Sequence, residues 1–130
     1  MRIPDETVTL LAEFVAEEDL RRARVVTGLP WRLIPRILNQ GAITFAPFVI
    51  YRHGRYRTDT ARSLALLAHE MVHIRQAREM GAVRFYASYL WGNIRCGFRH
   101  DRHHMEVPGI EKQREVRGVL ENRGGGGSRW

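Results

Sequence analysis

The chain has very little cysteine: Cys96 is the only one among 130 residues. A single thiol excludes an internal disulfide, and its isolation provides no spacing for a metal site. We therefore predict that Cys96 is a reduced, buried side chain.

Long apolar runs are also missing. No run approaches the roughly 20 residues that a membrane-spanning helix needs, and the N-terminal residues lack the apolar core of a secretory signal. These absences predict a cytoplasmic protein with no membrane partner. The length and the 44% share of hydrophobic residues predict one domain with one core.

Lysine is nearly absent: Lys112 is the only lysine, whereas 20 arginines are scattered along the chain. The net charge is +7. Such a charge suits nucleic acid or an acidic partner, but no nucleic-acid-binding motif accompanies it. The cluster Arg21, Arg22 and Arg24 follows the acidic residues 17–19, which is typical of a solvated helix end. We therefore expect nucleic acid at most as a secondary partner.

What the chain does contain is an HExxH motif formed by His69, Glu70 and His73. On an α-helix, residues four apart are rotated by about 400° and rise about 6 Å, so both imidazoles project from one stripe and can bind one metal ion. Glu70 can then reach a water on that metal. The alternative is a pair of packed or solvated histidines, but two buried imidazoles beside a carboxylate need polar partners, and a metal supplies them.

The sequence around the motif predicts a helix of about 20 residues. Asp59 or Thr58 can cap it, no Pro or Gly follows until after Met80, and Gly81 fits the position after its end. One face is apolar and the opposite face carries the motif, so both need cover and the helix is predicted to be central and buried. The first face comprises Leu64, Leu67, Ala68, Met71 and Ile74; the second comprises Leu66, His69, His73 and Ala77.

Zinc is the metal we predict, because catalytic zinc sites keep three protein ligands and one water, whose pKa falls to about 7. The third ligand is not in the motif helix. Glu79, six residues after His73, points about 120° or more away from the histidines. Gln76 and Glu79 also occupy the positions where the metzincin motif requires Gly and His. The third ligand is therefore expected in a later segment.

The segment 100–106 offers the candidates for the third ligand. We prefer Glu106, because Pro108 near a helix start and the run up to residue 120 predict another helix, whose positive end favours an ionised carboxylate. His103 and His104 are alternatives, since imidazole binds zinc equally well. Asp101 is a weaker option. The alternative for Glu106 itself is an ordinary capping carboxylate with no metal to bind.

With His69, Glu70, His73 and the distal Glu106, the chain resembles the gluzincin branch of zinc metallopeptidases. The stretch from residue 41 to about residue 112 is also similar to small bacterial zincin-like domains. This resemblance implies that His69, His73 and Glu106 bind Zn²⁺. It also implies that Glu70 is the general base that activates the water for attack on a peptide bond. It also implies an oxyanion donor, for which the candidates are Tyr86, Tyr89, His100, His103 and His104.

Other segments complete the predicted fold. Apolar alternation over residues 43–50, interrupted by Pro47, predicts one or two short strands. A turn at His53-Gly54 would lead into a third strand at residues 56–57. The zincin resemblance implies that a substrate adds to an edge strand, for which Gly41–Tyr51 is the candidate.

Helices are expected on both sides of this region. Residues 5–23 predict one amphipathic helix, and Trp31–Asn39 a shorter one that Pro35 interrupts. The spacing of Tyr86 and Tyr89 with Val83 and Leu90 predicts that these four residues form the aromatic core side of a helix after the motif. 

The Gly-rich composition of residues 123–130 predicts a flexible tail, and its GGGGS is typical of engineered linkers. Residues 1–122 are therefore the predicted domain.

These features predict an α+β, zincin-like fold that is helix-dominated, with a small antiparallel or mixed sheet and a central HExxH helix. The predicted function is that of a minimal zinc metallopeptidase acting on a peptide or protein substrate. The alternative is a non-catalytic, zinc-binding interaction or structural module, which the small size favours. Glu70 argues against that alternative, because a structural zinc site needs no water-activating carboxylate. Nothing in the sequence predicts the oligomeric state.

Overall fold

The computed structural model describes residues 1–27, 42–52, 56–97 and 103–123, so the helix predicted at Trp31–Asn39 and the tail from residue 124 lie outside the described residues. The elements, in chain order, are α1 (Asp5–Leu11), α2 (Glu17–Arg22), β1 (Arg24–Val26), β2 (Ala42–Phe45), β3 (Phe48–Tyr51), α4 (Ala61–Met80), α5 (Ala82–Arg95) and α6 (Val107–Arg123). Helices dominate and accompany one small mixed sheet, which confirms the α+β class.

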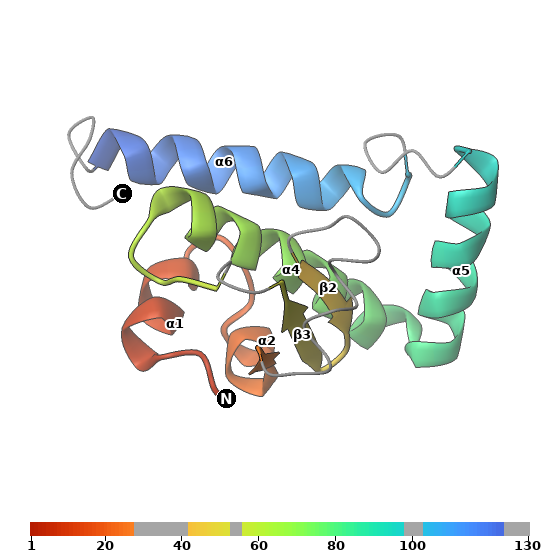
Figure 1. Ribbon diagram of the computed structural model, residues 1–130, viewed down its shortest axis with the longest axis horizontal. Helices are drawn as coiled ribbons and strands as arrows, with labels where there is room; N and C mark the ends of the chain where they lie inside the picture. The colour runs from red at the N-terminus through yellow and green to blue at the C-terminus, as the bar shows by residue number, and fades with distance from the viewer. Residues whose placement is uncertain (28–41, 53–55, 98–102, 124–130) are drawn as a thin grey trace.

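Helix α4 lies at the centre of the molecule, between α6 on one side and α1, α2 and the sheet on the other (Figure 1). Its N-cap is Thr60, whose Oγ1 accepts a hydrogen bond from the Ser63 N–H at 3.2 Å, and not Thr58 or Asp59 as predicted. Gly81 ends the helix with φ 85°, a conformation that glycine adopts without strain.

The prediction of a central buried helix is confirmed. All five residues of the apolar face are at most 5% exposed, and both histidines of the opposite face are also buried. Helix α6 covers the histidine side and packs along α4. Its buried residues, spaced at intervals of seven and four along the helix, are Gly109, Val116 and Leu120.

The sheet has the strand order β1-β3-β2. Strands β2 and β3 lie where short strands are predicted. They pair antiparallel, with Ile43 opposite Ile50, and β2 is an edge strand among the described strands, within the segment predicted for that role. The third strand predicted at residues 56–57 is wrong, because these residues are in no strand. The third strand is instead β1, which runs parallel to β3 and brings the apolar Val25 into the core. The alternation of apolar residues within one segment cannot predict this pairing, because the two strands are far apart in the sequence.

The single helix predicted over residues 5–23 is also wrong. The chain turns after α1, where the N–H groups of Phe14 and Val15 both donate to the Leu11 carbonyl, and α2 then begins at Glu17. The break lets Leu20 enter the core and lets the buried Asp19 accept hydrogen bonds from Arg78 on α4. The acidic residues at the start of α2 are a helix-start signal, but no Pro or Gly marks the break.

Three smaller predictions need correction. Val83 and Leu90 on α5 are 86% and 58% exposed, because the side of the helix that packs inward carries Phe85 and the tyrosines instead. Cys96 is half-buried at the C-terminal end of α5 and not fully buried. Arg123 belongs to α6 and not to the tail, and it pairs with the Glu13 carboxylate at 2.6 Å. Among the described helices, none combines the length and apolarity that crossing a bilayer requires.

Tyr51 provides a test of the core. Its side chain is 1% exposed, and its hydroxyl has no hydrogen-bond partner among the described residues. A buried hydroxyl without a partner costs free energy that a phenyl ring does not. We expect Tyr51→Phe to raise the free energy of unfolding by about 1 kcal/mol, measured as a higher thermal unfolding midpoint. A lower midpoint would show that the hydroxyl is hydrogen-bonded in solution.

Candidate metal centre

The two histidines of the motif point at one carboxylate oxygen. The Nε2 atoms of His69 and His73 lie 2.8 Å and 2.7 Å from Oε1 of Glu106. All three side chains are buried, and their ligand atoms lie within 4.8 Å of one another. Among the described residues, this is the cluster of His, Cys, Asp and Glu that could hold a metal ion.

Glu106 is positioned by the start of α6. It is the residue immediately before this helix, and its carbonyl accepts a hydrogen bond from the Ile110 N–H at 2.9 Å, as in the first turn of a helix. Burial raises the pKa of Glu106, but the hydrogen bonds from His69 and His73 outweigh burial and hold that pKa below its usual range. The carboxylate is therefore ionised, as a metal ligand must be.

Two glutamines orient the histidine rings. Gln76 donates from Nε2 to the Met105 carbonyl at 3.0 Å, so its Oε1 faces His73 and accepts from the Nδ1–H of that ring at 3.0 Å. Gln113 of α6 lies with Oε1 2.9 Å from Nδ1 of His69. With Nδ1 as donor, each Nε2 carries the lone pair that a metal needs, and such partners fix the tautomer of a ligating histidine.

Without metal, a proton lies between Nε2 of His73 and Oε1 of Glu106. Burial lowers the pKa of His73, but the hydrogen bond to Glu106 and the negative charge of Glu70 raise it to about 9 overall. The metal-free ring is thus cationic at neutral pH, with Nε2–H donating to Glu106. A divalent cation can replace this proton, because the same lone pair and the same carboxylate oxygen would bind it.

Tyr89 of α5 holds the other oxygen of the carboxylate. Its hydroxyl donates to Oε2 of Glu106, and its ring lies edge-on to His73 with centroids 6.0 Å apart. Burial and the charge of Glu106 raise the pKa of Tyr89, so the hydroxyl stays protonated and remains a donor. Glu106 is therefore left with Oε1 directed at the histidines.

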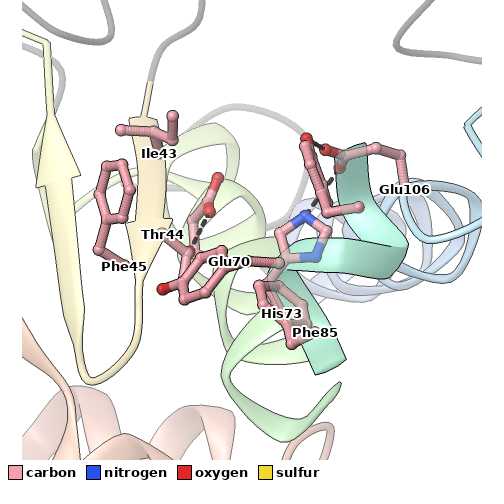
Figure 2. Close-up of a pocket in the computed structure, with 9 residues that line it drawn as sticks. Ile43, Thr44, Phe45, Glu70, His73, Phe85 and Glu106 are labelled. Atoms are coloured by element: carbon pink, nitrogen blue, oxygen red, sulfur yellow. Dashed lines mark hydrogen bonds and ion pairs between the residues drawn. The ribbon is translucent and has the colours of Figure 1, made fainter. Parts of the chain in front are cut away.

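Glu70 is separate from this cluster and lies in the wall of a cavity. Its Oε2 accepts a hydrogen bond from Oγ1 of Thr44, on strand β2, at 2.6 Å. Figure 2 shows Thr44 and Glu70 together on one side of the cavity, with His73 and Glu106 on the other. The cavity has a volume of about 180 Å³. Its lining is mostly apolar and comprises Ile43, Thr44, Phe45, Glu70, His73, Phe85, Tyr86, Tyr89 and Glu106.

The other candidate residues lie elsewhere. His103 is buried, but both ring nitrogens are engaged with the backbone: Nε2 lies 2.7 Å from the Tyr89 carbonyl, and Nδ1 accepts from the Met105 N–H at 3.0 Å. His104 stacks on His103 and is exposed beside a different hollow. The structure therefore brings Glu106, and neither of these histidines, to the motif. Of the five oxyanion candidates, Tyr86 and Tyr89 line the cavity, and His100, like Asp101, lies outside the described residues.

A family model described as the eCIS core domain matches residues 2–81. The chain belongs to the eCIS core domain family. No curated protein and no solved structure matches it. The eCIS core region, residues 2–81, comprises α1, α2, the sheet and α4, and therefore contains His69, Glu70 and His73. Glu106 follows that region, so the cluster combines two side chains from the eCIS core region with one from the segment after it.

Sequence reasoning missed three residues that act on the site. Gln76 could have been found, because it lies three residues after His73 on the same face of α4. Thr44 and Gln113 carried no local signal, since each reaches the site from another element. Thr44 belongs to the eCIS core region, whereas Gln113 lies on α6 beyond it.

Gly109 allows a test of the packing between α6 and the eCIS core region. A Cβ there would lie 2.9 Å from Nε2 and Cδ2 of His69. We expect Gly109→Ala to displace this ring and weaken zinc binding by about 10- to 100-fold, the range seen when the support of a ligand is lost. Competition against a chromophoric chelator measures the effect. Gly118→Ala is the matched control: no atom lies within 4 Å of its Cβ, so it should keep zinc affinity and stabilise α6 by about 1 kcal/mol. Equal affinities in both variants would contradict the prediction.

Proposed function

We propose that this protein is a minimal zinc-dependent metallopeptidase of gluzincin type with a zincin-like fold. The observation that carries the proposal is the convergence of the Nε2 atoms of His69 and His73 on Oε1 of Glu106, with Glu70 in the wall of the adjoining cavity. Two imidazoles and one carboxylate are a ligand set that catalytic zinc sites use, and three protein ligands leave a position for water.

The donor set fits zinc. His69, His73 and Glu106 would hold the ion, with Gln113 and Gln76 fixing the ring tautomers. Bound zinc supplies Lewis acidity, which lowers the pKa of water toward neutrality and polarises a carbonyl group.

Glu70 would hold and move the proton. As general base it takes a proton from water at one carboxylate oxygen, while Thr44 donates to the other and fixes the orientation of the side chain. The proton then passes from Glu70 to the amine that leaves. Tyr86 lines the same cavity and is the donor that we favour for the oxyanion, because the hydroxyl of Tyr89 is already bonded to Glu106.

The substrate would lie along β2. Among the described strands, β2 pairs on one side only, with β3, and its residues Ile43, Thr44 and Phe45 line the cavity. An extended peptide can add to such an edge through main-chain hydrogen bonds. Peptides or proteins are therefore the substrate class that we propose.

Metal content and cleavage together test the proposal. Elemental analysis of the full chain should give near one zinc per chain, and a peptide mixture followed by mass spectrometry should show cleavage that a chelator abolishes. Zinc without cleavage would favour the non-catalytic zinc-binding module, for which the small volume of the cavity argues. Absence of metal from protein purified without chelator would overturn both.

The pH dependence of stability should differ between the metal-free and the zinc-loaded protein. Without metal, the pKa of His73 is raised from 6.5 to about 9. The stabilisation that the protonated ring gives to the folded state is therefore fully present below pH 6.5 and is lost as the pH rises toward 9. Zinc binds the deprotonated ring, so its stabilisation grows over the same range.

We therefore expect the zinc-free protein to lose about 1–3 kcal/mol between pH 6.5 and 9, and the difference from the zinc-loaded protein to widen. Thermal unfolding with and without chelator, at several pH values, measures this difference. Parallel curves for the two forms would show that His73 does not exchange a proton for metal.

A further inference from the structure

The outer side of α5 carries an exposed apolar stripe, which we call the α5 stripe: Val83, Leu90, Trp91 and Ile94, which are 86%, 58%, 58% and 55% exposed. Their spacing of seven, one and three residues places them on one face of the helix. Four of the eight exposed large hydrophobic side chains of the described residues belong to this single helix. A concentration of this kind marks a surface that contacts something else.

The stripe is separate from the metal centre. The opposite side of α5 packs inward through Phe85, Tyr89 and Gly92, where it contacts the cavity and His103. In Figure 1, α5 stands at one end of the molecule, across the ends of α4 and α6, and no other described element extends beyond it on that side. A flat surface could therefore approach along the full length of the helix.

The charged side chains that α5 itself places beside the stripe are positive. Arg84 and Arg95 are exposed and, at 100° per residue, follow Trp91 around the helix by about 20° and 40°. Helix α5 contains no Asp or Glu. The surface thus combines an apolar face containing Trp with a basic edge, and the net charge of +7 adds long-range attraction to an anionic surface.

We propose that the α5 stripe docks onto the surface of a bilayer that contains anionic phospholipids. A helix with Trp and aliphatic residues on one face, bordered by arginine, is the pattern of helices that lie in the interface of a membrane without crossing it. A second copy fits less well, because two α5 helices packed face to face would bring arginines together with no acid to pair them. This surface contact departs from the sequence prediction of no membrane partner, which considered only spanning segments.

Docking would also place the cavity near the lipid. Phe85, Tyr86 and Tyr89 line the cavity from the same helix, so the cavity lies within about one helix diameter, 10 Å, of the docked face. The docking itself does not depend on catalysis, and zinc-free protein should bind in the same way.

Co-sedimentation of the full chain with vesicles tests the proposal. Binding to vesicles of phosphatidylcholine mixed with phosphatidylserine should exceed binding to phosphatidylcholine alone by at least about 10-fold, since each arginine near an anionic surface adds attraction. The double variant Leu90→Ser/Ile94→Ser should lose at least about 10-fold of that binding. Its substitutions are at exposed positions, and an unchanged thermal unfolding midpoint shows that it folds.

Charge-matched variants separate the stripe from net charge. Arg84→Ser should weaken binding more than Arg117→Ser, which removes the same charge from the exposed face of α6. Addition of vesicles should shift tryptophan emission to the blue in wild type, and Trp91→Phe should remove the shift.

Three results would overturn the proposal. The first is no preference for anionic vesicles, and the second is vesicle binding that survives the Leu90→Ser/Ile94→Ser change and so reports net charge alone. The third is protein that does not bind vesicles but forms a dimer in sedimentation velocity, or binds an acidic amphipathic peptide, in a way that the Leu90→Ser/Ile94→Ser change abolishes.

Discussion

The Glu70→Gln variant is expected to bind zinc like wild type and to lose peptide hydrolysis by about 10²- to 10⁴-fold, the usual contribution of a general base. The substitution keeps size and shape. An amide oxygen can still accept the hydrogen bond that Oε2 of Glu70 accepts from Thr44 at 2.6 Å, so the side chain should stay in place. What the amide cannot do is accept a proton from water. Steady-state cleavage of a fluorogenic peptide and elemental analysis of the same preparation measure both quantities.

Glu79→Gln is the matched control for this variant. Glu79 lies on the same helix but is exposed, and its carboxylate pairs with Arg75 at 2.8 Å. Its loss should leave cleavage within about 2-fold of wild type, because exposed ion pairs contribute little. Cleavage that persists in Glu70→Gln would contradict the proposed role of Glu70. Cleavage that falls together with zinc content would mean that the site itself was lost.

Removal of the Glu106 carboxylate should have the second large effect. We expect Glu106→Ala to weaken zinc binding by more than about 100-fold, because even the loss of a residue that only supports a ligand costs 10- to 100-fold. The metal-free protein should also be destabilised, by about 3–5 kcal/mol, since buried charged partners would be left unpaired. His69, His73 and the Tyr89 hydroxyl all bond to this one carboxylate. Chelator competition and thermal unfolding measure the two effects.

Two further variants sharpen the result. Glu106→Gln keeps the volume and the hydrogen bonding of the side chain, so it should fold better than Glu106→Ala and yet bind zinc poorly, because a neutral amide is a weak ligand for zinc. Glu111→Gln removes an exposed carboxylate from α6 and should change neither the zinc affinity nor the thermal unfolding midpoint. Wild-type zinc affinity in Glu106→Ala would assign the third ligand to another residue, for which Asp101, His103 and His104 are the alternatives from the sequence.

The motif helix could be predicted in detail because its signals are local. The four-residue spacing of His69 and His73, the apolar face of α4 and the glycine at its end all lie within about 20 consecutive residues. A helix repeats every 3.6 residues, so such a pattern reveals which side chains share a face. The same reasoning predicted a helix after Glu106, where α6 lies, and short strands at residues 43–50, where β2 and β3 lie, because these signals are close together in the sequence.

Three of the errors, in the N-terminal helix, the third strand and the outer face of α5, share one cause, which is packing between segments that are distant in sequence. The break after α1 follows from the packing of Leu20 and the bonding of Asp19 to Arg78, 59 residues away. The third strand of the sheet is β1, which pairs with β3 more than 20 residues later. The stripe on α5 has the spacing of a core face, and only the arrangement of helices shows that Val83 and Leu90 face outward.

The sequence by itself determined the candidate site of this protein: it places two imidazoles and a carboxylate on one helix and predicts a third ligand from a later segment. The tertiary structure decided which residue meets them. It placed Glu106 at the histidines, engaged both nitrogens of His103 with the backbone, and brought Gln113 and Thr44 to the site from other elements. The physical reason is that side-chain type and helical spacing are local properties, whereas convergence on a single point depends on how α6, α5 and β2 pack around α4.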